Sequence, residues 1–81
     1  MKVVVLLFAG LKERVGEREL RVEMSGIVTV RDLLTQLAKR HPVLDGYPFA
    51  VAVNGHYASR DASLAEGDEV ALIPPVSGGS L

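Results

Sequence analysis

The stretch from Thr29 to Pro42, TVRDLLTQLAKRHP, decides the fold because it is the clearest helical pattern in the chain. Thr29 is a good N-cap residue, and Asp32 places a carboxylate near the free N–H groups of the first turn. Apolar residues then recur at i, i+3, i+4, i+7 and i+8 and form one stripe, made of Val30, Leu33, Leu34, Leu37 and Ala38. Pro42 stops the pattern, so we predict a helix over Val30–Arg40.

Two strands are predicted before this helix. Residues 2–8 are mostly β-branched or large apolar residues, and both faces of the strand are apolar. Residues 19–23 alternate, with Leu20 and Val22 facing inward, which is typical of a half-exposed strand. We expect the two strands to pair as a hairpin. Residues 10–16 form a charged connector between them, with room for one helical turn.

Three shorter strands are predicted after the helix. Residues 43–48 form a loop, and Asn54-Gly55 is a strong signal for a tight turn. The predicted strands are residues 49–53, residues 56–59 and residues 69–73. Pro74 and Pro75 end the last strand, because proline has no N–H group to donate to a neighbouring strand.

The order of elements is β-β-α-β-(β)-β, which indicates an α+β protein of the β-grasp type. We expect a mixed sheet of four to five strands with one main helix across one face. The first and last strands are the most apolar, so they are expected to lie side by side and parallel at the centre of the sheet. The domain is predicted over residues 1–74, followed by a flexible C-terminal tail at residues 75–81, with no second domain.

One feature of the strands is not explained by this core. A single helix covers one face of the sheet, yet the central strands are apolar on both. Side chains such as those of Val4, Leu6 and Phe8, or their neighbours of opposite parity, should therefore lie on an open face. A contiguous exposed apolar patch usually marks a binding site for another protein. The alternative is that the loop at residues 43–48 folds over this face.

The C-terminal residues, Pro74-Pro75-Val76-Ser77-Gly78-Gly79, are the second unusual feature. Two prolines favour an extended chain, which spans roughly 15 Å from Pro75 to Gly79 at about 3.1 Å per residue. Two glycines have no side chains, so they can enter a narrow channel and let reactive groups approach the backbone. The pattern favours a carboxylate that is delivered into the active site of another protein.

Composition excludes several other functions. The net charge of −1 argues against a nucleic-acid partner, since such domains need a surplus of basic residues. The absence of cysteine excludes disulfides, thiolate metal sites and cysteine nucleophiles. His41 and His56 are too isolated for a metal site. No stretch approaches the ~20 apolar residues of a membrane span, and the chain is compatible with the cytoplasm.

The chain resembles a known family, the small subunit of molybdopterin synthase. The residues that carry the resemblance are Leu7-Phe8-Ala9-x-Leu11-Lys12-Glu13, the turn and strand Gly67-Asp68-Glu69-Val70-Ala71 and, above all, Pro74-Pro75-Val76-Ser77-Gly78-Gly79. They extend over nearly the whole chain. A bare Gly-Gly ending would be less specific, because thiamine sulfur carriers, tRNA-thiolation carriers and ubiquitin-like modifiers share it.

The resemblance implies a sulfur carrier that is not an enzyme by itself. Gly79 would be adenylated by an E1-like adenylyltransferase that uses ATP, and sulfur would then replace AMP to give a thiocarboxylate. The tail, Pro75, Val76, Ser77 and Gly78, would insert into the large subunit of the synthase. There the sulfur would pass to cyclic pyranopterin monophosphate. Phe8, Ile73 and Pro74 would contact the protein partners, and the chain itself would bind no cofactor and no metal.

The sequence departs from the family pattern at its end, because Ser80 and Leu81 follow Gly79. A thiocarboxylate forms at Gly79 only after they are removed. Proteolytic processing, an expression tag and a larger fused polypeptide are the alternatives. The alternative functions are a sulfur carrier for thiamine or tRNA thiolation and a ubiquitin-like modifier that is attached to lysines through Gly79.

Overall fold

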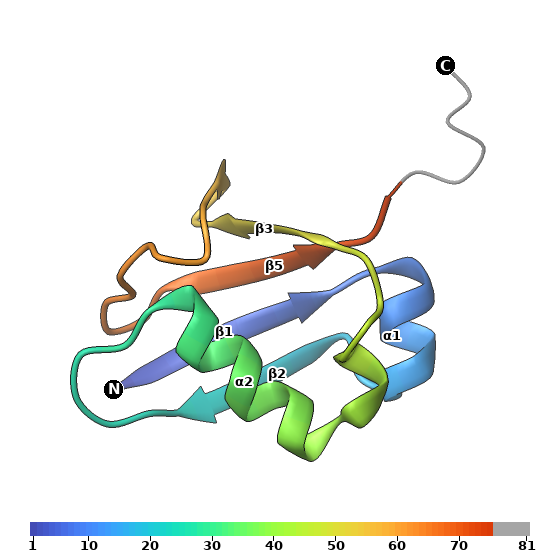
Figure 1. The fold of residues 1–81 in the computed structure, drawn as a ribbon, viewed down its shortest axis with the longest axis horizontal. Helices are drawn as coiled ribbons and strands as arrows, with labels where there is room; N and C mark the ends of the chain where they lie inside the picture. The colour runs from blue at the N-terminus through green and yellow to red at the C-terminus, as the bar shows by residue number, and fades with distance from the viewer. Residues whose placement is uncertain (76–81) are drawn as a thin grey trace.

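Strand β1 (Lys2–Leu7) has a neighbouring strand on each side, as Figure 1 shows. In the computed structural model, which describes residues 1–75, β2 (Glu19–Glu23) pairs with it antiparallel and β5 (Glu69–Ile73) pairs with it parallel. Strand β3 (Ala50–Val53) lies antiparallel to β5, and β4 (His56–Tyr57) forms the far edge. The strand order is therefore β2-β1-β5-β3-β4. The predicted β-grasp fold is confirmed, including its central parallel pair.

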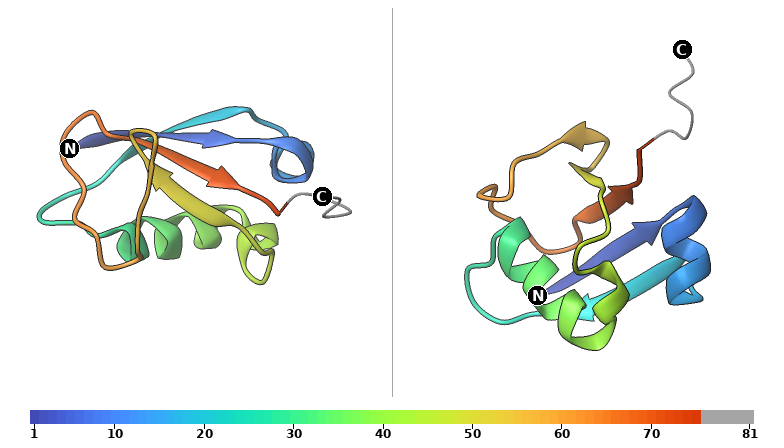
Figure 2. Two further views of the ribbon diagram at one scale, coloured as in Figure 1. Left: turned by 90° about the horizontal axis from the view of Figure 1, so that it is seen from above. Right: turned by 45° about the vertical axis from the view of Figure 1, so that its right-hand side comes forward.

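Helix α2 (Val30–Arg40) crosses one face of this sheet, so the domain has two layers (Figure 2). The helix begins where the sequence predicts, because Thr29 and Asp32 form a reciprocal capping box. The N–H of Thr29 donates to Asp32 Oδ2 at 2.9 Å, and the N–H of Asp32 donates to Thr29 Oγ1 at 3.2 Å. The N–H groups of Val30 and Arg31 donate to loop carbonyls at residues 62 and 60. The N–H groups in the first turn of α2 therefore find acceptors in the cap and in the neighbouring loop.

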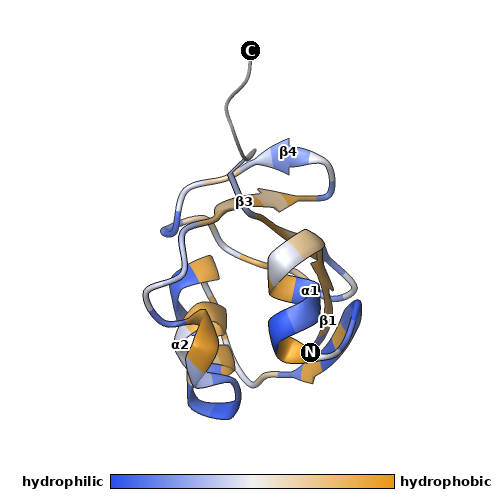
Figure 3. Ribbon diagram, turned by 90° about the vertical axis from the view of Figure 1, so that its right-hand side faces the viewer, coloured by the Kyte–Doolittle hydropathy of each residue, from blue (hydrophilic) through white to orange (hydrophobic). Residues whose placement is uncertain are grey.

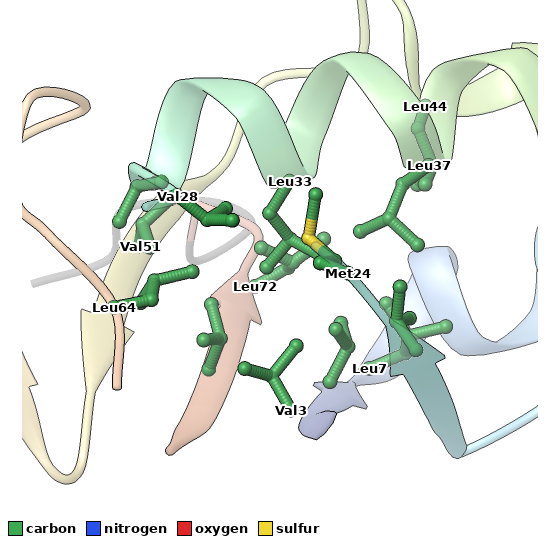
Figure 4. Packing of buried hydrophobic residues seen from close by; sticks show 14 of the residues in the cluster. Val3, Leu7, Met24, Val28, Leu33, Leu37, Leu44, Val51, Leu64 and Leu72 are labelled. Atoms are coloured by element: carbon green, nitrogen blue, oxygen red, sulfur yellow. The ribbon is translucent and has the colours of Figure 1, made fainter. Parts of the chain in front are cut away.

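The core lies between α2 and the sheet. Leu33 and Leu37 point from the helix toward Val3, Leu7 and Leu72 of the strands (Figure 4). All five side chains are at most 2% exposed. Leu34 also packs against this cluster, but it is only half-buried and lines a groove on the outer side of the helix as well.

The segment between β1 and β2 differs from the prediction. Instead of a connector with one turn, it forms a second helix, α1 (Ala9–Val15), at one end of the sheet (Figure 1). Leu11 is fully buried there and Val15 is half-buried, while the charged residues face solvent. Gly16 ends the helix with a φ of 88°, and its N–H donates to the carbonyl of Lys12 at 2.8 Å.

Smaller differences concern the ends of elements. The first strand stops at Leu7 rather than Phe8, and β3 starts at Ala50 rather than Phe49. Strand β4 has two residues instead of the four predicted. The loop at residues 43–48 begins with a short 3-10 helix, Pro42–Leu44, which packs against α2 and not against the open face of the sheet.

Candidate functional site

The face of the sheet that points away from α2 is partly apolar. In β1, Val3, Val5 and Leu7 are buried, whereas Val4 and Leu6 between them are half-buried. This alternation follows from the geometry of a strand, in which successive side chains point to opposite faces. The structure thus confirms that apolar side chains lie on a face that α2 does not cover.

The strand register extends this surface across the sheet. Leu6 lies beside Ala71, Ala71 beside Ala52, and Ala52 beside Tyr57. Residues opposite one another in a sheet share a face, so these side chains join one patch. We call it the open sheet face. Its apolar members are Val4, Leu6, Ala50, Ala52, Tyr57, Ala71 and Ile73, and the charged residues Glu19, Arg21 and Glu69 lie on the same face. Figure 3 shows the hydrophobic character of β1 and β3 and the hydrophilic character of β4.

Phe8 and Ile73 come to the same end of this face. Leu7 and Leu72 are opposite one another in the parallel pair, so the next residues on both strands leave the sheet together. Phe8 is 46% exposed, Pro74 is half-buried and Pro75 is exposed. The three residues predicted to contact protein partners, Phe8, Ile73 and Pro74, therefore lie where the chain leaves the domain.

A small surface pocket of about 230 Å³ adjoins this point. Leu6 and Phe8 contribute its apolar side, and Lys12 and Arg18 bring two cations to it. Ala9 also lines the pocket and has a φ of 46°, an unusual value for a residue with a side chain. This backbone turns the chain sharply from β1 into α1. No local pattern in the sequence marks Lys12 and Arg18 as a pair, because only the pairing of β1 with β2 brings them together.

The remaining predicted site residues, Val76, Ser77, Gly78 and Gly79, lie outside the described residues, as do Ser80 and Leu81. The last described residue, Pro75, follows directly on β5 and the end of the open sheet face. The acidic turn at residues 66–69 lies at the other end of β5. Asp68 has a structural role in this turn, because its carboxylate accepts hydrogen bonds from Asn54 Nδ2 at 2.9 Å and from the N–H of Ala65 at 2.7 Å.

The described residues contain few groups suited to catalysis. Within residues 1–75 no three His, Asp or Glu side chains gather in a way that could hold a metal ion. Over the same residues, no helix is long and apolar enough to cross a membrane. The pKa of Asp32 is lowered by its hydrogen bonds from Thr29, but this carboxylate caps α2 on the other side of the sheet. The surface at the end of β1 and β5 is suited to binding.

The comparison with family models gives one match, to the ThiS family, over residues 5–79. The chain belongs to this family. It is thus a ubiquitin-like sulfur carrier, a small protein that is not an enzyme by itself. The match ends on Gly79 and leaves out Ser80 and Leu81.

Two of the relatives carry different names. Small archaeal modifier protein 1 of Haloferax volcanii is 42% identical, over 90% of this chain and 95% of its own. Its crystal structure matches with a TM-score of 0.89 at 38% identity, over 98% of this chain and all of that one. The molybdopterin synthase sulfur carrier subunit of Chlamydomonas reinhardtii is 39% identical, over 98% of this chain and all of its own.

One solved structure shows a relative bound to a partner. It is the complex of subunits 1 and 2 of the molybdopterin-converting factor from Helicobacter pylori, in which the matching chain is 26% identical. The TM-score is 0.73, and the match covers 98% of this chain and all of that one.

Proposed function

We propose that this chain carries sulfur for molybdopterin synthesis. The observation that carries the proposal is that the family match ends on Gly79, the residue whose carboxylate the reaction needs. The relative from Chlamydomonas reinhardtii, matched over its whole length, bears the name of that carrier subunit. Residues 1–74 act as the domain, and residues 75–81 act as a tail from which Ser80 and Leu81 are removed.

The proposed chemistry takes place on the carboxylate of Gly79. This carboxylate attacks the α-phosphorus of ATP in an E1-like adenylyltransferase, and pyrophosphate leaves. A persulfide of the activating system then attacks the acyl carbon and AMP leaves, which gives an acyl disulfide. A second thiol of that system attacks the donor sulfur, forms a disulfide with the donor and releases the thiocarboxylate. In the large synthase subunit the thiocarboxylate gives its sulfur to cyclic pyranopterin monophosphate, and water restores the carboxylate. We place these steps in the cytoplasm.

Without a cysteine, the chain has no side-chain thiol that could hold a persulfide, so the C-terminus is the plausible sulfur site. Val76, Ser77 and the slim Gly78 form the part of the tail that enters the large subunit. The open sheet face, with Phe8, Ile73 and Pro74 at its end, supplies the docking surface for the large subunit and for the activating enzyme.

The first test is the intact mass of the untagged protein purified from its own cells. The expected mass is that of a chain ending at Gly79. Co-expression with an E1-like adenylyltransferase should then replace one oxygen by sulfur. A matched chain ending at Gly78 should fail in sulfur transfer to cyclic pyranopterin monophosphate by the large subunit. If every molecule purified from the cells retained Ser80 and Leu81, the proposal would be contradicted.

A second test addresses the docking surface. Ala71 lies at the centre of the open sheet face, between Leu6 and Ala52, so Ala71→Glu puts a charge where an apolar contact is needed. Ala65→Glu is the matched control, because Ala65 is exposed in the turn at the far end of β5. Ala71→Glu should weaken binding to the large subunit by about tenfold or more, and Ala65→Glu should not. If both folded variants bound the large subunit with the same affinity, the open sheet face would not be the docking surface.

A second candidate function is protein modification. The observation that favours it is the 42% identity to a protein named small archaeal modifier protein 1. In this case the Gly79 carbonyl would form an isopeptide bond with a lysine Nζ of another protein. Mass spectrometry of proteins that are purified together with this chain would detect such isopeptide bonds. Isopeptide bonds without any thiocarboxylate form of the chain would favour protein modification as the function.

A further inference from the structure

A second surface lies on the side of the molecule that carries α2. It is a groove of about 580 Å³ between the outer side of α2 and the loop that follows it, and we call it the helix-side groove. Its helical wall consists of Arg31, Leu34, Thr35, Ala38 and Lys39. These positions have the i, i+3, i+4, i+7, i+8 spacing of one helix face, next to the buried stripe. No member of the open sheet face is among the lining residues of this groove.

The opposite wall is apolar and held in place. It includes Leu44, Tyr47 and Phe49. Leu44 is 5% exposed, and its N–H donates to the carbonyl of His41 at 2.9 Å. The guanidinium of Arg60 lies over the ring of Phe49, 5.7 Å from its centroid. The groove is therefore formed before any ligand arrives.

The charges at the rim of the groove are mostly positive. Arg31, Lys39 and Arg60 line it, and Asp45 is the single acidic residue among the lining residues. Arg31 forms an ion pair with Asp61, whereas Lys39 and Arg60 make no ion pair within residues 1–75. The chain as a whole has a net charge of −1, so the groove is a local concentration of cations.

We propose that the helix-side groove binds an acidic amphipathic segment of a partner protein. Leucine-like side chains of this segment contact Leu34, Tyr47 and Phe49, and carboxylates on either side meet Lys39 and Arg60. The helical wall from residue 31 to residue 39 is about 12 Å long, which matches about two turns of helix or four extended residues. Three cations are too few for a nucleic acid, and the groove lacks the buried polar groups that orient a small molecule.

The groove lies on the side of the domain opposite to the open sheet face. Helix α2 covers one face of the sheet, and the open sheet face is on the other (Figure 2). A partner held in the groove would therefore leave the open sheet face and the start of the tail accessible. The carrier could be retained by one protein while its tail is processed by another.

The test uses the full chain and a fluorescein-labelled synthetic peptide of about twelve residues, in which leucines at helical spacing alternate with aspartates and glutamates. Arg60→Glu and Lys39→Glu should each weaken binding by about fivefold or more, since attraction becomes repulsion. Arg21→Glu is the matched control, because Arg21 is an exposed arginine on β2. Peptides with lysines in place of the acids, or serines in place of the leucines, should not bind.

Amide chemical shifts of the labelled protein locate the site. The peptide should shift signals of residues 31–39 and 44–49. Shifts on the open sheet face, equal binding of the lysine peptide, or no binding at millimolar peptide would overturn the proposal. Shifts of the groove residues that grow with protein concentration, without peptide, would identify a second copy of this chain as the occupant and would overturn it too.

Discussion

At the scale of single residues, Gly10 has no side chain, and this allows α1 to pack closely against Tyr47. A Cβ atom at Gly10, in the first turn of α1, would overlap with the hydroxyl oxygen of Tyr47 and lie 3.5 Å from Cζ of its ring. The guanidinium of Arg14, one turn further along α1, lies over this ring, 5.2 Å from its centroid. The contact fixes α1 against the loop that forms the helix-side groove.

We therefore predict that Gly10→Ala lowers the free energy of unfolding, although alanine is the better helix former by about 1 kcal/mol. In a Tyr47→Phe background the hydroxyl is absent and the closest contact is an ordinary one, so the same change should be neutral or stabilising. Urea denaturation of the four proteins gives the coupling, expected at about 1 kcal/mol. Additive effects would mean that the two residues do not meet.

At the scale of the element, α2 depends on its capping box. Thr29→Ala removes the acceptor for the N–H of Asp32 and should lower the free energy of unfolding by about 1 kcal/mol, whereas Thr29→Ser should retain most of it. Thermal and urea denaturation of the three proteins check the order. For comparison, the core truncation Leu33→Ala should lower the free energy of unfolding by about 2–5 kcal/mol.

The same cap makes stability depend on pH. Hydrogen bonds from Thr29 hold the pKa of Asp32 below its ordinary value of 3.8. The stabilisation is therefore present above that value and is lost as the pH falls through the lower pKa of the folded state. Asp32→Asn should lower stability near neutral pH, and its difference from the parent protein should shrink in acid. Asp45→Asn, which also removes one exposed carboxylate, is the control for the change in net charge.

Helix α2 was predicted from the sequence, whereas helix α1 and the helix-side groove were not. The cap, stripe and proline of α2 act locally, so its bounds were predicted correctly. Helix α1 was missed as a helix because it has seven residues and one fully buried side chain, and tertiary contacts stabilise it. The spacing of Leu11 and Val15, followed by Gly16, was the signal that could have revealed it. The helix-side groove needs contacts between residues far apart in the chain, which no local pattern contains.

At the scale of the whole molecule, the parallel pairing of β1 with β5 decides where the described chain ends. Because both strands run in the same direction, Phe8 and Ile73 finish at one end of the sheet, and the chain leaves through Pro74 beside them. In the proposed function, the partner that receives the residues after Pro75 also contacts this end. The proposal therefore links affinity to delivery of the tail through the topology of the sheet.

This link predicts an unequal contribution of the two exposed aromatic residues on this side. Phe8 is 46% exposed at the start of the tail, whereas Tyr57 is 78% exposed on the edge strand β4, three strands away from β1. Interface energy concentrates in central residues that are fully desolvated, and rim residues contribute little. Phe8→Ala should weaken binding of the large synthase subunit by about tenfold or more, and Tyr57→Ala by less than about threefold. Calorimetry on the folded variants measures both, and a larger loss with Tyr57→Ala would move the centre of the interface to β4 and separate it from the tail.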